Sequence, residues 1–276
     1  MLSYQGVNAT LLTKHEKASA LQPALRDSLD ITLEEYSQFD TDRLGTFTGS
    51  VSRLSDQIGT AQYKAELATK LGNHPIGLGS EGSFNSDSGL GILNTEVLVW
   101  FDSNRSLTIT AIANQWLMAE ANILCQWRQM REYAERCDFP EQGLILRPNH
   151  GQAESVYLDA SDLAQLEQQF RHCLSISQQS KVWVEFDFRA HRCPKRQSTL
   201  SLAAEDLCRR LSQSCPTCYL PGFGLYKAEP GRACSNCGSP TTQVGVRIYQ
   251  CPHCDYQQQQ SIEQYADPFY CGYCNP

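Results

Sequence analysis

The segment His74-Pro-Ile-Gly-Leu-Gly-Ser-Glu-Gly-Ser-Phe84 lies near the centre of the N-terminal part of the chain. Its small and apolar residues predict a short buried strand over residues 76–78. The strand is expected to end in a turn that carries one carboxylate, Glu81, beside Gly82. Because α/β proteins bind ligands beyond the carboxyl ends of their strands, Glu81 is the first candidate for a functional site.

The segments on either side of this stretch alternate between strand and helix patterns. The expected strands cover residues 9–12, 31–36, 76–78, 96–102, 107–112, 144–146 and 182–188. Five helices are expected. The first begins near residue 16 and is kinked or restarted at Pro23, the second is capped by Ser55 and ends at Gly72, and the fourth is capped by Ser161. The third and fifth are indicated by apolar stripes, formed by Ile123, Trp127, Met130 and Ala134 and by the leucines from Leu200 to Leu211. This alternation predicts an α/β domain over residues 1–212, with a mixed or mostly parallel sheet flanked by helices.

Composition narrows the class of protein. The 276 residues have a formal charge of −7 and are 41% hydrophobic, which is typical of a globular chain. Broad nucleic-acid affinity is not expected, because it requires many Lys and Arg contacts to phosphate. We find no apolar run of about 18 residues and no basic, signal-like N-terminus, so we expect a cytoplasmic protein without a membrane partner.

The C-terminal part carries a metal-binding pattern. Eight of the 13 cysteines form four Cys-x-x-Cys pairs, at Cys215 and Cys218, Cys234 and Cys237, Cys251 and Cys254, and Cys271 and Cys274. Two such pairs complete a tetrahedral thiolate site, so the spacing predicts a zinc-ribbon-like module over residues 213–276 with two structural zinc ions. Sequential pairing would give two tandem ribbons and alternate pairing a cross-brace; the spacing favours the sequential arrangement.

Four-cysteine sites have no open position for a substrate, so we expect them to be structural. The module also contains aromatic residues that could stack on nucleic-acid bases. The module has three basic and four acidic residues, so it lacks the positive charge that nucleic-acid binding requires. The sequence therefore favours the interpretation that these rings form a small core around the metals. A protein or nucleic-acid partner for this module remains an open alternative.

Two basic segments of the α/β part are typical of phosphate sites. The first enters a helix, where free amides and nearby lysines attract anions; it comprises Thr13, Lys14, His15 and Lys17. The second lies between a strand and a helix; it comprises Arg189, His191, Arg192, Lys195 and Arg196. For an acidic chain, a phosphorylated ligand is a natural reason for such clusters, and a solvated basic turn is the alternative.

Three further polar residues complete the candidate set. Asp42 lies in a hydroxyl-rich loop over residues 40–49, which could bind a metal ion or simply be a polar loop. Lys64 borders an alanine stripe and is either functional or an ordinary surface lysine. Glu96 lies on an expected strand and is a secondary carboxylate candidate, as is Asp42.

Several strings resemble a bacterial family described as a domain of unknown function. They are ATLLTKHEK, TDRLGTFTGSVSR, TAQYKA, SEGSF, DFRAHRCPKR and the closing cysteine pairs with CNP. This resemblance covers most of the chain and implies no activity.

The order of motifs also resembles the inosine/xanthosine triphosphate pyrophosphatases. The matching parts are ATLLTKHEK, the Ala61-Gln-Tyr-Lys-Ala65 helix, the Ser80-Glu-Gly-Ser83 turn and Ala190-His-Arg192. The resemblance implies that Glu81 holds Mg²⁺ or orients the attacking water. It also implies that cations neutralise the phosphates, namely Lys14, Lys17, Lys64, His191 and Arg192. Two departures stand out: Gly59 occupies a position where some of these enzymes have a metal-binding glutamate, and the first strand lacks their Asn and Gly.

Two hypotheses therefore follow from the sequence. One is a Mg²⁺-dependent nucleoside triphosphate pyrophosphohydrolase that acts on a small phosphorylated ligand. The other is a non-catalytic sensor or adaptor whose zinc module binds protein or nucleic acid. Convergence of Glu81, Lys14 and Arg192 would favour the enzyme, and exposed aromatics on the zinc module would favour the adaptor.

Overall fold

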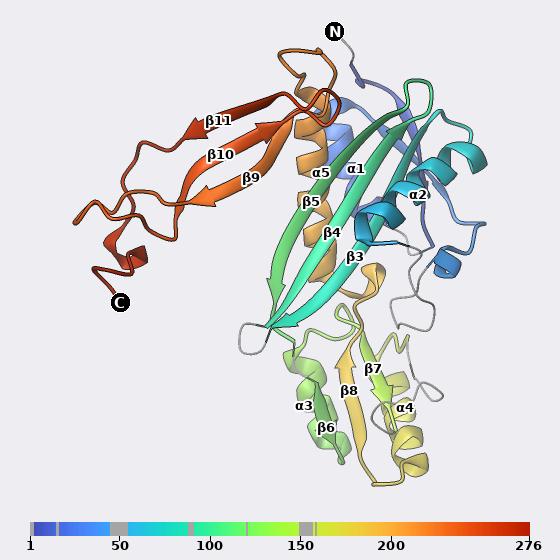
Figure 1. Cartoon of the computed structure of the whole chain (residues 1–276). Helices are drawn as coiled ribbons and strands as arrows, with labels where there is room; N and C mark the ends of the chain where they lie inside the picture. Colours follow the sequence, from blue (N-terminus) through green and yellow to red (C-terminus); the bar gives the residue numbers. More distant parts are fainter. Residues whose placement is uncertain are drawn as a thin grey trace.

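The computed structural model describes residues 3–14, 17–44, 55–87, 91–119, 121–148, 157 and 159–276. It contains a five-stranded sheet with helices on both faces, a second sheet of three strands, and a three-stranded C-terminal module that extends away from the first sheet (Figure 1). The fold is thus α/β with a small cysteine-rich C-terminal part, as the sequence predicts.

The first sheet has the strand order β2-β1-β3-β4-β5. Its strands are β1 (Asn8–Leu12), β2 (Thr32–Tyr36), β3 (Ile76–Asp87), β4 (Gly91–Asp102) and β5 (Leu107–Leu117). Only β1 with β2 and β1 with β3 pair in parallel, whereas β3, β4 and β5 form an antiparallel meander. The sheet is therefore mixed, which confirms the first of the two expected alternatives, and it is not mostly parallel.

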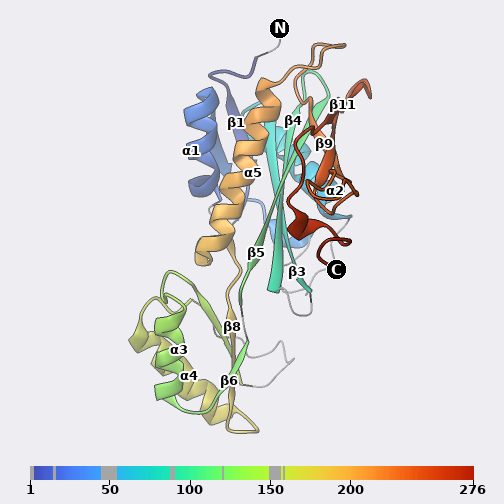
Figure 2. The same ribbon diagram turned by 90° about the vertical axis from the view of Figure 1, so that its left-hand side faces the viewer.

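Helices cover both faces of this sheet (Figure 2). Helices α1 (Ala18–Leu29) and α5 (Pro194–Ser212) lie on one face, where the largest apolar cluster includes Leu78, Leu98 and Trp100. Helix α2 (Gln57–Leu71) lies on the other face against Val97 and Val99. Pro23 lies inside α1 without ending it.

A second sheet with its own apolar cluster lies within residues 122–186. Its order is β6-β8-β7, built from β6 (Asn122–Leu124), β7 (Leu144–Arg147) and β8 (Val182–Phe186), and it packs with α3 (Trp127–Arg136) and α4 (Leu163–Ile176). Ile123 belongs to β6 and not to the expected helix, because the segment pairs with β8 before α3 begins. The helix caps are Asp56 and Asp162, whose carboxylates accept backbone N–H bonds, and not the neighbouring serines.

The stretch around Glu81 differs most from the sequence prediction. β3 continues through Glu81 to Asp87, because each of its twelve residues has a register partner on β4. Glu81 therefore lies inside a long strand and not in a turn at its end. β3 also extends beyond its other neighbour, β1, because β1 pairs with β3 only at Thr10 and Leu11.

The C-terminal module begins where α5 ends, at Ser212. Its strands are β9 (Gly224–Pro230), β10 (Val244–Gln250) and β11 (Gln257–Ser261), and it contains the short helix η3 (Pro268–Tyr270). Two other short helices, η1 (Thr41–Leu44) and η2 (Ala190–Arg192), lie in the preceding part of the chain. The module rests on the end of α5 through bonds such as Gly222 N to Arg210 O (2.8 Å) and Arg210 Nη2 to Leu225 O (2.9 Å). The division into domains at residues 212 and 213 stays a prediction.

Within the described ranges, no helix combines the length and the apolar character that a bilayer crossing requires.

Candidate functional site

The eight cysteines of the Cys-x-x-Cys pairs form two clusters in the C-terminal module. One contains Cys215, Cys218, Cys251 and Cys254; the other contains Cys234, Cys237, Cys271 and Cys274. In each cluster all sulfur atoms lie within 4.8 Å of one another. Each cluster could hold a metal ion with four thiolates, the donor set that structural zinc sites use.

The spacing of the sulfur atoms suits a metal ion and not disulfides. The Sγ atoms of Cys215 and Cys254 are 3.6 Å apart, and those of Cys234 and Cys274 are 3.9 Å apart. A tetrahedral zinc ion with bonds of about 2.3 Å would place its sulfur ligands about 3.8 Å apart. The thiols of the two clusters differ in the absence of an ion: the hydroxyl and backbone N–H of Ser239 lower the pKa of Cys237 to about 6, whereas burial raises the pKa of Cys251 to about 12. A bound metal would require all four thiols of a cluster to be deprotonated.

The clusters combine alternate pairs, so the favoured sequential pairing is wrong. The first pair joins the third and the second joins the fourth. The reason is the antiparallel sheet: β9 leads away from the first pair to the second, and β10 leads back to the third. The first cluster therefore lies beside α5, where His253 Nε2 donates to Pro221 O (3.1 Å), and the second lies at the far end of the module (Figure 1).

A second group of polar residues surrounds β3. On the α2 face, Lys64 Nζ forms an ion pair with Glu81 Oε1, and both side chains are almost completely buried. Gly79 permits this pair, because a Cβ there would lie 1.9 Å from the Ala61 carbonyl oxygen. Helix α2 can thus lie directly against β3 and bring Lys64 to Glu81.

A matching ion pair lies on the opposite face. Glu96 is the register partner of Gly82, so it projects to the α5 side, where Arg196 Nε donates to its Oε1 (2.7 Å). A Cβ on Gly82 would lie 2.4 Å from Arg196 Nη2. The space beside Gly82 therefore accommodates this ion pair.

Arg196 is held from several sides. Its Nη1 donates to Phe188 O (2.7 Å), and its guanidinium lies 5.6 Å from the ring centre of Phe84. The Phe84 and Phe188 rings stack with centroids 4.4 Å apart. On the same face, Asn94 Nδ2 donates to Glu96 Oε1 (3.1 Å), whereas Glu96 Oε2 and Asn94 Oδ1 are buried without a hydrogen-bond partner among the described residues.

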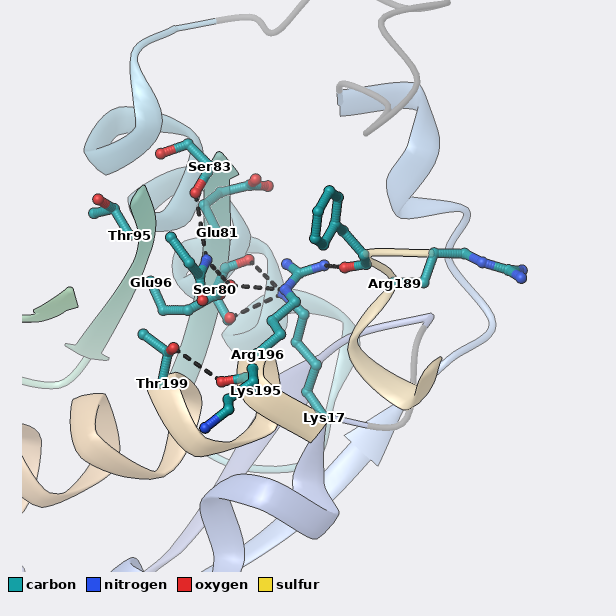
Figure 3. A network of polar contacts seen from close by, with 12 residues as sticks. Lys17, Ser80, Glu81, Ser83, Thr95, Glu96, Arg189, Lys195, Arg196 and Thr199 are labelled. Carbon is teal, nitrogen blue, oxygen red and sulfur yellow. Dashed lines mark hydrogen bonds and ion pairs between the residues drawn. The ribbon is translucent and has the colours of Figure 1, made fainter. Parts of the chain in front are cut away.

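Lys17, at the start of α1, interacts electrostatically with both ion pairs. Its Nζ donates to Ser80 Oγ (3.0 Å) and lies 3.5 Å from Ser80 O. Burial lowers the pKa of Lys17 to about 8, helped by Arg196 and opposed by Glu96. Figure 3 shows Lys17, Glu96 and Arg196 converging near Ser80. We call Lys17, Lys64, Glu81, Glu96 and Arg196 the β3 cluster.

The β3 cluster lies where β1 has already ended. β1 covers β3 only as far as Leu78, so the edge of β3 from Ser80 onward faces the turn that carries Lys17. This is the carboxyl end of the parallel pair of strands, the position at which α/β sheets bind ligands. Side chains from both faces, such as Lys64 and Lys17, can approach a ligand only at such an edge.

The other basic residues of the sequence prediction do not join the cluster. Lys14 pairs with Asp40 at the surface (3.0 Å). Arg189 binds Asp187 and Asp159, and Arg192 Nη2 donates to Ala160 O (2.6 Å), so both arginines tie η2 to the second sheet and its loops. In Figure 3, Arg189 and Lys195 point away from Lys17.

The remaining candidate residues lie outside the β3 cluster or outside the described residues. Thr13 is buried directly after β1, and His191 lies partly exposed in η2. His15 and the side chain of Asp42 lie outside the described residues. The interpretation of the 189–196 segment as one solvated basic turn is wrong, because Arg189, Arg192 and Arg196 are all at least partly buried and bonded.

Three residues of this site, Ser80, Asn94 and Phe84, are not among the candidates that the sequence pattern indicates. Ser80 binds Lys17, Asn94 orients Glu96, and Phe84 packs on Arg196. Only period-two alternation along β3 and β4 could have placed Ser80, Asn94 and Glu96 on one face, and that required knowing that both strands are long.

Comparison with protein families agrees with the first resemblance. The chain matches the family model "Domain of unknown function (DUF6671)" over residues 64–276 and belongs to that family. No curated protein and no solved structure matches the chain. The matched range includes both cysteine clusters and most of the β3 cluster, but it begins after Lys17.

Proposed function

We propose that the β3 cluster binds the phosphate groups of a nucleotide, and that the chain hydrolyses a nucleoside triphosphate to the monophosphate and pyrophosphate. The observation that carries this proposal is Lys17. Its amine is buried, and no described carboxylate lies within ion-pair distance of it. An anionic ligand at the edge of β3 would supply the negative charge that this lysine lacks.

The roles of the individual groups follow from their positions. Lys17 and Lys64 would approach the polyphosphate from the two faces of the sheet. Arg196 would act mainly by holding Glu96 and Phe188 in place, because its guanidinium is already bonded to both. Water would attack the α-phosphorus, the bond to the bridging oxygen would break, and pyrophosphate would leave with that oxygen.

Magnesium would supply charge neutralisation at the phosphates. Glu81 is the carboxylate best placed to hold the ion, because Mg²⁺ in such sites often uses one or two carboxylates together with phosphate oxygens. Glu96 cannot share that ion directly with Glu81, since the two project from opposite faces of the sheet. The unpartnered Glu96 Oε2 is instead suited to accept a hydrogen bond from an ordered water molecule or from the ligand.

The decisive experiment incubates zinc-loaded protein with Mg²⁺ and a panel of nucleoside triphosphates, including deaminated bases, and measures pyrophosphate. We expect release from at least one nucleotide, and loss of that release in Glu81→Gln. The matched control is Glu34→Gln, which removes a surface carboxylate that pairs with His74. Absence of pyrophosphate from the whole panel, with both zinc ions bound, would refute the hydrolase.

A binding measurement separates ligand recognition from catalysis. A non-hydrolysable triphosphate analogue should bind the wild type, and Lys17→Met should weaken that binding by about 1.5–3 kcal/mol, the usual size of a charge-assisted contact. If Lys14→Met, a surface control, weakened binding as much as Lys17→Met, the site would lie elsewhere.

The alternative function, a non-catalytic adaptor, has two observations in its favour. Lys14 and Arg192, whose convergence on Glu81 would have favoured the enzyme, bind Asp40 and Ala160 instead. The zinc module exposes large aromatic side chains, among them Tyr226 and Tyr273. Exposed rings of this kind are enriched at interaction surfaces. This alternative and the hydrolase involve separate surfaces, so one chain could perform both.

A further inference from the structure

The far end of the zinc module presents an aromatic surface to solvent. Around the second cysteine cluster, Tyr273 is 81% exposed, Tyr265 is 70% exposed and Phe269 is 69% exposed. Tyr270 packs edge-on against Phe269, with ring centroids 5.2 Å apart. We call these four residues the aromatic tip. Figure 1 places η3, which carries two of them, at the end of the module most distant from the five-stranded sheet.

The backbone beneath the aromatic tip is firmly held. Ala266 N donates to Ala233 O (2.7 Å), and Ser235 N donates to Ala266 O (2.9 Å). Asp267 Oδ1 accepts from Phe269 N (2.8 Å), and Asn275 Nδ2 donates to Phe269 O (3.0 Å). The metal ligands Cys271 and Cys274 flank Tyr273 in the sequence. The rings are therefore displayed on an anchored scaffold, which lowers the entropy cost of binding a partner.

The charge around the aromatic tip is negative. Residues 233–240 and 262–276 include Glu263 and Asp267, both exposed, and contain no lysine, arginine or histidine. The adjoining Arg232 is half-buried, and its Nε donates to Val244 O (2.9 Å), so the two exposed carboxylates outnumber this one cation. A divalent zinc ion held by the four thiolates of the second cluster would add a further two negative charges to this end of the module. Electrostatics therefore opposes a nucleic acid, which needs cationic side chains around its phosphates.

We infer that the aromatic tip is a docking surface for an arginine- or lysine-rich segment of a protein partner. Cationic side chains are attracted to the faces of aromatic rings and to the acidic surroundings at the same time. A large exposed aromatic surface with one sign of charge matches this type of partner better than an uncharged or acidic one. The surface is remote from the β3 cluster, so the inference does not rest on the proposed hydrolase.

The test uses the full zinc-loaded chain and a short peptide in which arginine alternates with serine. Two comparison probes have the same length: the peptide with citrulline in place of arginine, and a thymidine oligonucleotide. Calorimetry should detect binding of the arginine peptide, weakening as salt is raised, and much weaker binding of both other probes. Equal binding of the citrulline peptide, preferential binding of the oligonucleotide, or no binding of the arginine peptide would overturn the inference.

Variants of the chain locate the surface. Replacing Tyr265, Phe269 and Tyr273 together by leucine keeps apolar bulk but removes the ring faces, and should reduce affinity by about tenfold. Tyr226→Leu, an equally exposed tyrosine on β9, is the matched control and should change affinity less than twofold. Zinc content of two per chain confirms that each variant is folded.

Two results would contradict the location. Equal loss in Tyr226→Leu would show that the peptide binds elsewhere. A homodimer that dissociates in the triple variant would show that the aromatic tip contacts a second copy of the chain and not a basic partner.

Discussion

The C-terminal module and the β3 cluster are built in opposite ways. Each cysteine cluster gathers its ligands from two Cys-x-x-Cys pairs, so half of every site is fixed within four residues of sequence. The β3 cluster gathers single residues from separate elements, and its ion pairs join residues as far apart as Glu96 and Arg196. Stability in the module should therefore depend on metal, whereas stability around β3 should depend on the fold as a whole.

The largest expected effect comes from removing metal. Structural zinc sites contribute about 10–16 kcal/mol in apparent binding free energy, and the module has few apolar residues to replace that contribution. We expect a strong chelator to abolish hydrogen-exchange protection in β9, β10 and β11 and to leave protection in β3 and β4. Simultaneous loss in β4 would contradict this contrast, because it would show that both regions unfold as one unit.

Paired cysteine variants should change the metal content in steps. The alternate pairing predicts that Cys215→Ser with Cys251→Ser removes one zinc ion and leaves the other. It predicts that Cys215→Ser with Cys234→Ser disables both sites. Sequential pairing predicts the reverse, so elemental analysis of these two double variants tests the pairing directly.

The difference between the regions also explains what the sequence could predict. Cys-x-x-Cys spacing is local, so all eight cysteines of the two clusters were identified, but the pairing depended on how β9 and β10 lead the chain between the clusters. Lys64, Glu81 and Glu96 were identified as chemically suitable residues. Their division between two faces was not, because it depends on the full length of β3 and on the register that opposes Gly82 to Glu96.

Local signals also failed where tertiary contacts decided the outcome. The cations of residues 189–196 were predicted as one group, yet Arg189 and Arg192 bind loops of the second sheet and Arg196 enters the first. The sequence contains no sign of this division, since acceptors such as Ala160 O are backbone atoms that any residue could provide. Long-range packing therefore decides which basic residues remain near β3.

Breaking the ion pair on the α5 face should cost the fold about 3–5 kcal/mol. Arg196→Ala would leave the completely buried Glu96 without its cation, which is expensive in an apolar setting. Urea unfolding should show this loss at pH 7. The exposed pair of Lys14 and Asp40 offers the control, and Lys14→Ala should cost about 1 kcal/mol or less.

A double change sharpens this measurement. Glu96→Leu together with Arg196→Met removes both charges, so it should restore much of the stability that Arg196→Ala loses. If Arg196→Ala instead cost no more than Lys14→Ala, Glu96 would be neutral or hydrated in the folded protein, and the charged pair would not support the sheet.

The smallest expected effect on the free energy of unfolding concerns Lys17. Its replacement should stabilise the fold, whereas Arg196→Ala should destabilise it. Its pKa falls from the ordinary 10.5 to about 8, so below pH 8 the folded protein carries the full cost of a buried charge. Between about pH 8 and 10.5 the unfolded chain binds more protons at this residue than the folded one, so its contribution to stability rises with pH. Lys17→Met should therefore be more stable than the wild type at pH 7, by at most about 3 kcal/mol.

The advantage of Lys17→Met should disappear as the pH approaches 10.5, and urea unfolding of both proteins from pH 7 to pH 10.5 measures the difference. Groups common to both proteins, such as the buried Tyr4, cancel in this comparison. A residue that costs stability when alone and binds an anion when ligand is present is typical of a functional site. If Lys17→Met were less stable than the wild type throughout this range, Lys17 would be a structural residue, and the proposed phosphate site would lose its main support.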